Sequence, residues 1–84
     1  MKKSEILDAV VDSLIKESDL EISKENVTLG NKLEEFALDS MQGVVMMMDL
    51  EEKYNISISD DEMDKLETIG DLVNIIQKKL SDLD

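Results

Sequence analysis

Residues 39–54 read DSMQGVVMMMDLEEKY, and they carry the clearest structural signal in the chain. Asp39 and Ser40 both favour helix N-caps, and they precede a mostly apolar run without proline. We therefore predict a helix from Ser40 to about Tyr54.

The apolar positions of this helix fall into two stripes when each residue advances it by about 100°. The first stripe contains Met46, Met47, Leu50 and Tyr54 with the small Gly43, and the second contains Met41, Val44, Val45 and Met48. A bundle helix needs one buried stripe. The second stripe is therefore either covered by a loop or partly exposed as a contact surface.

Three further segments predict helices. The first has a single apolar stripe, formed by Ile6, Leu7, Val10, Val11, Leu14 and Ile15. A capping box of Ser59 and Glu62 predicts a short helix that carries Met63 and Leu66. Thr68 is the candidate cap of a last helix, whose stripe is Ile69, Leu72, Val73, Ile76 and Leu80.

Two connecting segments lack a helical period. Residues 18–38 are typical of a long loop anchored by scattered apolar side chains, and residues 55–59 of an extended connector. The sequence thus predicts one all-α domain over residues 1–84, a small four-helix bundle with a long first loop and a short third helix.

Composition narrows the possible functions. The chain has 21 acidic and 9 basic residues, no histidine and no cysteine, and its net charge is −12. Thiolate catalysis, zinc–thiolate sites and histidine-based triads are excluded. An acidic surface repels nucleic acid and attracts basic protein patches. We expect a cytoplasmic monomer with no metal site, no nucleic-acid partner and no membrane insertion.

The Asp39-Ser40 pair offers two candidate caps where one helix needs only one. In the simplest interpretation, capping is all that either residue does. If Asp39 makes the cap, however, the Ser40 hydroxyl is left at the positive end of the helix. That position suits a covalently attached phosphate.

Asp-Ser-Met followed by an apolar helix ending in Glu51-Glu52 resembles the phosphopantetheine attachment site of acyl carrier proteins. The likeness covers most of the chain, including the long loop and residues 68–71. It implies that Ser40 bears 4′-phosphopantetheine, installed from coenzyme A by a phosphopantetheinyl transferase that Asp39 helps to position. The thiol of that arm would hold acyl groups as thioesters for enzymes of fatty-acid, polyketide or related biosynthesis. The resemblance therefore implies a carrier and not an enzyme.

The resemblance also implies two surfaces. Acyl-loading and acyl-processing enzymes with basic docking patches would contact Met41, Val44, Val45, Met48, Glu51 and Glu52. The acyl chain would be sheltered between the second and third helices, in a pocket lined by Leu33, Met47, Leu50, Ile58, Met63 and Leu66. Ordinary core packing is the alternative role of these six side chains.

Four positions depart from the common pattern of fatty-acid carriers. Ala37 replaces a frequent glycine and Met41 a frequent leucine, while Gln42 and Val45 occupy positions that are often acidic. We therefore expect a specialised carrier that serves a dedicated pathway. A D-alanyl or other aminoacyl carrier is the nearest alternative, and a non-covalent acidic interaction module is the alternative from another class.

Overall fold

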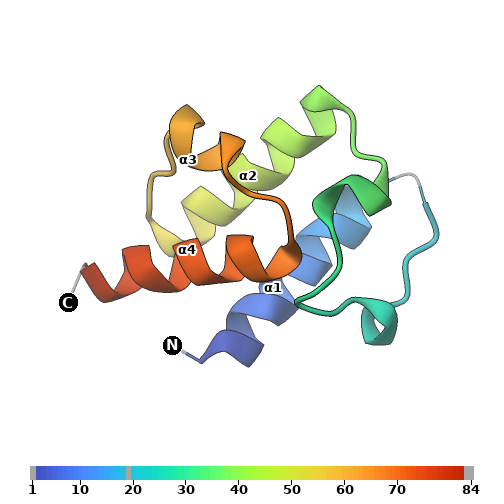
Figure 1. Cartoon of the computed structure of the whole chain (residues 1–84), viewed down its shortest axis with the longest axis horizontal. Helices are drawn as coiled ribbons and strands as arrows, with labels where there is room; N and C mark the ends of the chain where they lie inside the picture. The colour runs from blue at the N-terminus through green and yellow to red at the C-terminus, as the bar shows by residue number, and fades with distance from the viewer. Residues whose placement is uncertain (1, 19, 83–84) are drawn as a thin grey trace.

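A computed structural model describes residues 2–18 and 20–82 of the chain (Figure 1). Its α-helices are α1 (Lys3–Glu17), α2 (Ser40–Tyr54), α3 (Asp60–Asp64) and α4 (Ile69–Asp82). The long segment between α1 and α2 contains two 3₁₀ turns, η1 (Lys24–Asn26) and η2 (Leu33–Phe36). The predicted all-α bundle with a short third helix is confirmed.

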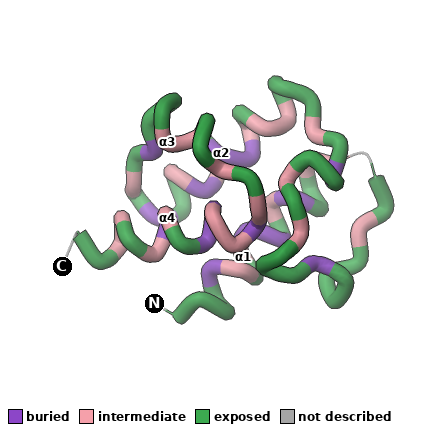
Figure 2. Tube along the Cα trace, in the orientation of Figure 1, coloured by how far each residue is buried: buried purple, intermediate pink, exposed green. Residues whose placement is uncertain are grey.

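The core lies where α1 packs against both α2 and α4 (Figure 2). Its buried side chains are Ile6, Val10, Val11, Leu14, Val27, Phe36, Met46, Met47, Leu50, Tyr54, Ile58, Ile69, Leu72, Val73 and Ile76. Each such side chain stabilises the fold by about 1.5–3 kcal/mol through burial. The predicted place of Ile15 on the buried stripe is wrong, because its side chain is 38% exposed near the end of α1.

The long loop is attached to the start of α4 through main-chain hydrogen bonds. The N–H groups of Ile69 and Gly70 donate to the carbonyls of Asn31 and Leu29, at 2.9 and 2.8 Å. The first N–H groups of a helix have no partner within the helix, so these loop carbonyls complete the first turn of α4. Figure 1 shows the loop returning beside this end of α4.

Side chains cap the N-termini of α3 and α4 as predicted. Ser59 accepts the N–H of Glu62, and Thr68 Oγ1 accepts the N–H of Asp71 at 3.1 Å. The Asp71 carboxylate accepts the N–H groups of Glu67 and Thr68, and these bonds lower its pKa.

The prediction that the third helix carries Leu66 is wrong. Helix α3 ends at Asp64, and Lys65 closes it with its N–H bonded to the carbonyls of Glu62 and Met63. Leu66 therefore lies in the connection to α4, where it is half-buried. No helix in the described part of the chain is long and apolar enough to cross a membrane.

Candidate functional site

The turn before α2 sets the position of Ser40. Helix η2 ends at Phe36, and its C-cap Ala37 adopts a left-handed conformation with φ 52° and ψ 37°. Asp39 then occupies the N-cap of α2, and its Oδ1 accepts the N–H of Gln42 at 2.7 Å. The Gln42 side chain accepts the N–H of Asp39 at 3.0 Å in return. Asp39 and Gln42 thus form a reciprocal capping box.

Ser40 is the first residue of α2, and its side chain is exposed. Since the Asp39 carboxylate makes the cap, the helix does not depend on the Ser40 hydroxyl. Backbone N–H groups and the helix dipole create partial positive charge at this end of a helix, where phosphate is favoured. The position therefore fits an oxygen that carries a phosphodiester.

The capping box also gives Gln42 a structural role. Glutamine completes such a box as glutamate does, but it adds no charge. The first turn of α2 consequently contains no acidic side chain. Compared with glutamate, Gln42 leaves the surface beside Ser40 with one negative charge fewer, and it still completes the capping box that starts the helix.

An apolar cavity of about 350 Å³ opens beside Ser40. Four of the six predicted pocket residues line it: Leu33, Met47, Met63 and Leu66. Leu50 and Ile58 do not line it and are buried in the core, at 1% and 4% exposure. The structure places the cavity between α2, η2 and the segment around α3, nearer to Ser40 than the predicted set suggested.

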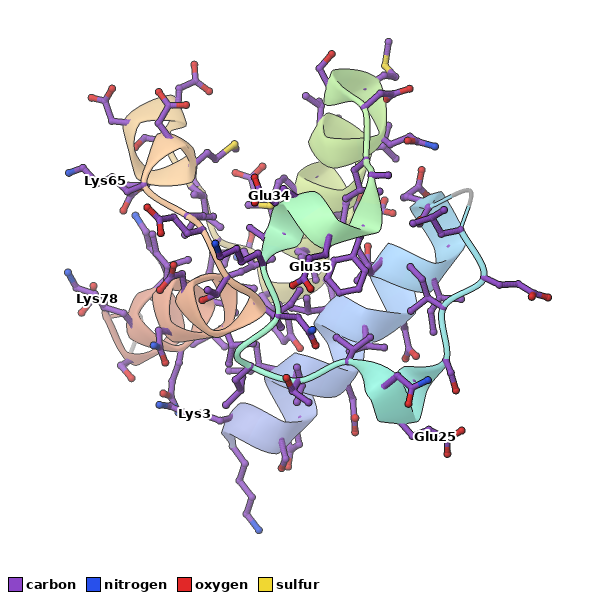
Figure 3. The ribbon with its side chains drawn as sticks, turned by 45° about the vertical axis from the view of Figure 1, so that its right-hand side comes forward. Lys3, Glu25, Glu34, Glu35, Lys65 and Lys78 are labelled. Atoms are coloured by element: carbon purple, nitrogen blue, oxygen red, sulfur yellow. The ribbon has the colours of Figure 1, made fainter. Side chains whose placement is uncertain are left out.

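The cavity lining contains further residues that sequence reasoning did not assign to it. These are Glu34, Leu38, Gly43, Val44 and Met46, together with Asp39 and Ser40 themselves. Glu34, labelled on η2 in Figure 3, is the second acidic residue of the lining. Leu38 is an apolar residue directly before Asp39-Ser40, and this adjacency is the sequence signal that could have assigned it to the lining.

The second stripe of α2 is largely exposed. Met41, Val44 and Met48 are 70%, 52% and 60% exposed, while Val45 is half-buried. We call Met41, Val44 and Met48 the apolar strip. It begins next to Ser40 and follows α2 away from it, so an exposed apolar surface lies directly beside the candidate site.

The two glutamates of the predicted docking surface differ in their surroundings. Glu52 is exposed. Glu51 is half-buried, and its Oε2 accepts the N–H of Ile58 at 2.8 Å. Glu51 therefore holds the connector after α2, whereas Glu52 has no bond of this kind among the described residues. The described residues also contain no group of three His, Cys, Asp or Glu side chains that could hold a metal ion.

Comparisons with known proteins agree with this geometry. A family model described as "Phosphopantetheine attachment site" matches residues 9–76. An acyl carrier protein of Exiguobacterium sp. is 34% identical over 80 residues, covering 95% of this chain and 100% of the relative. One from Thermotoga maritima is 33% identical over 81 residues, covering 95% and 99%.

Solved structures show the same fold. The crystal structure of an acyl carrier protein from Thermotoga maritima superposes with a TM-score of 0.82 at 27% identity, covering 100% of this chain and 96% of that one. The acetyl actinorhodin acyl carrier protein from Streptomyces coelicolor gives a TM-score of 0.69 at 23% identity, covering 100% and 95%.

The fold and the site define a small helical domain of the phosphopantetheine-attachment class. Within that class, the chain belongs to the acyl carrier protein family. Members of this family are carriers rather than catalysts, and their cofactor is covalently attached 4′-phosphopantetheine. They interact with a phosphopantetheinyl transferase and with biosynthetic enzymes.

Proposed function

We propose that Ser40 bears the 4′-phosphopantetheine arm and that the protein presents acyl groups on it to partner enzymes. One observation supports this most directly. Ser40 is exposed at the N-terminus of α2, Asp39 makes the cap in its place, and an apolar cavity opens beside it. When bound, the arm supplies a thiol that holds the acyl group as a thioester, which no side chain of a cysteine-free chain could do.

Attachment requires a transferase and coenzyme A. The Ser40 hydroxyl loses its proton as Oγ forms a bond to the phosphorus next to the pantetheine. The phosphoanhydride bond of coenzyme A breaks, and adenosine 3′,5′-bisphosphate leaves with the electron pair. The exposed Ser40 side chain leaves Oγ accessible to this reaction. Asp39 is the adjacent N-cap residue, and its proposed second role is to help position the transferase.

We propose the apolar cavity as the shelter for the acyl chain. An apolar cavity of about 150 Å³ holds a benzene ring, so about 350 Å³ accommodates a longer chain. The lining presents three methionines, Met46, Met47 and Met63, whose flexible thioethers adapt to different shapes. The two acidic residues, Glu34 and Asp39, favour a cargo that carries no negative charge in the cavity.

The apolar strip is proposed as the docking surface for partner enzymes. A partner with an apolar contact area inside a basic rim would complement both the strip and the net charge of −12. Gln42 and Val45 remove two acidic positions from this surface, which supports a specialised pathway rather than bulk fatty-acid synthesis. Poor loading of the protein by general fatty-acid-synthesis enzymes would support a role in a specialised pathway, and efficient loading would contradict that role.

The alternative is a D-alanyl or other aminoacyl carrier. The acidic residues Glu34 and Asp39 beside Ser40 favour it in one respect, because they would attract the ammonium group of an aminoacyl cargo. The two functions differ in the enzyme that loads the thiol. Transfer from an ATP-dependent adenylating enzyme supports the aminoacyl carrier, whereas transfer from an acyltransferase supports the acyl carrier.

The proposed function is tested by loading in two steps. The chain is incubated with a broad-specificity phosphopantetheinyl transferase and coenzyme A, and the product is then offered an acyl donor with each type of loading enzyme. Intact-mass measurement after each step should show one arm and then one acyl group. An unmodified chain after the first step would contradict the proposal.

A further inference from the structure

Gly43 lies in the interior of α2, where glycine is among the poorest helix formers. Two common reasons for a glycine are absent here. Its φ is not positive, and a Cβ added to it would meet no heavy atom within 4 Å beyond its chain neighbours and the local helix backbone. Neither backbone conformation nor close packing among the described residues therefore explains the missing side chain.

Gly43 does line the cavity, three residues after Ser40. Residues three apart on a helix lie on the same face, one turn from each other. Its neighbours in the lining on α2 are Val44, Met46 and Met47, all of which present side chains. Gly43 is thus the position in α2 where the cavity wall is left open next to the attachment serine.

We propose that Gly43 is a specificity-determining residue that keeps the mouth of the cavity open, so that a neutral acyl chain of medium length enters it from Ser40. This inference rests on the proposed function, because the chain must be attached at Ser40. A side chain at position 43 would occupy the free space around the glycine. It would narrow the path from Ser40 to the apolar lining while leaving the core packing around Leu50 unchanged.

The test compares two cargoes on the same arm. Wild type and Gly43→Val are loaded directly with acetyl- or octanoyl-coenzyme A by a broad-specificity transferase, and intact mass verifies complete loading. The melting temperature of each form is then measured. The difference between the octanoyl and acetyl forms reports burial of the longer chain, since the arm and the thioester are common to both.

The octanoyl form of the wild type should melt several degrees above its acetyl form, and Gly43→Val should lose most of that difference. Lys53→Val is the matched control, because it introduces the same side chain at an exposed position of α2 outside both the cavity lining and the apolar strip. It should retain the wild-type difference. Gly43→Ala narrows the cavity mouth less than Gly43→Val does. It should therefore lose only part of the difference in melting temperature between the octanoyl and acetyl forms.

Each outcome decides the proposal. An equal octanoyl increment in wild type, Gly43→Val and Gly43→Ala would overturn it, and so would a wild type whose melting temperature does not respond to the octanoyl group. Failure of the transferase to modify wild type would contradict the function of Ser40 instead, and intact mass separates that result from the others.

Discussion

The backbone N–H of Gly70 donates to the carbonyl oxygen of Leu29 at 2.8 Å, and a Cβ atom on Gly70 would lie 2.9 Å from the same oxygen. This close approach joins the long first loop to the start of α4. The same loop contributes Leu33 and Glu34 to the cavity lining, so the contact also positions one wall of the site.

Gly70→Ala should destabilise the protein. The new methyl group would press against a backbone oxygen that a side-chain rotation cannot relieve, and overpacking of this kind costs about 1–3 kcal/mol. Urea denaturation measures the change. Gly43→Ala is the matched control, since its methyl group enters open space, and it should stabilise the protein by about 1 kcal/mol through helix propensity. A Gly70→Ala variant as stable as wild type would contradict this account of the loop.

Ala37→Gly should stabilise the protein. A left-handed conformation costs an L-residue roughly 1–2 kcal/mol, and glycine avoids that cost. The greater freedom of glycine in the unfolded chain offsets roughly 0.4–1 kcal/mol of the gain. We expect a net increase of about 0.5–1 kcal/mol in the free energy of unfolding.

The control for this change is Ala9→Gly, within the helical part of α1. It should lower the free energy of unfolding by about 1 kcal/mol, because glycine weakens a helix interior. An equal loss of unfolding free energy in Ala37→Gly and Ala9→Gly would show that the backbone at Ala37 is unstrained.

Glu62 should make stability depend on acid pH. Its pKa is lowered from 4.5 to about 2 by the N–H of Ser59 and by the ammonium group of Lys79 at 3.0 Å. A pKa that is lower in the folded state contributes stability above the unfolded value. That contribution is present above about pH 4.5 and is lost as the pH falls toward about 2.

The measurement is the difference in unfolding free energy between wild type and Glu62→Gln across this pH range. The difference should shrink as the pH falls. Glu52→Gln, which removes one exposed charge from α2, corrects for general charge repulsion. A difference that stays constant from pH 5 to pH 2 would contradict the assignment.

Met48→Ser should weaken docking without weakening the fold. Met48 is 60% exposed on the apolar strip, so its loss removes contact area for a partner rather than core packing. Truncating a residue that contributes to an interface costs about 1–2 kcal/mol, which corresponds to a fall of roughly 5–30-fold in kcat/KM of the transferase. Leu20→Ser, at an exposed apolar position on the long loop, should leave kcat/KM unchanged. Equal effects of the two variants would argue against a docking role for the strip.

The sequence predicted the helices well because their apolar periods are clear. The predicted span of α2 matches the observed Ser40–Tyr54, and the caps at Ser59 and Thr68 lie where expected. The pairing of the long loop with α4 was not predicted, because it uses main-chain N–H and carbonyl groups that any sequence supplies.

The site was only partly predictable for a similar reason. Two neighbouring caps suggested that one hydroxyl was spare, and the structure gives the capping role to Asp39. The cavity, by contrast, depends on how η2 and the connection after α3 approach α2. Apolar pattern alone could not separate Leu50, which packs in the core, from Met47, which lines the cavity.

The attachment of phosphopantetheine to Ser40 is tested most directly by intact-mass measurement after incubation with coenzyme A and a broad-specificity transferase. Wild type should gain one phosphopantetheine group, and Ser40→Ala should gain none. Ser59→Ala, which removes the capping serine of α3, should be modified as wild type is. Modification of Ser40→Ala, or an unmodified wild type, would contradict the account.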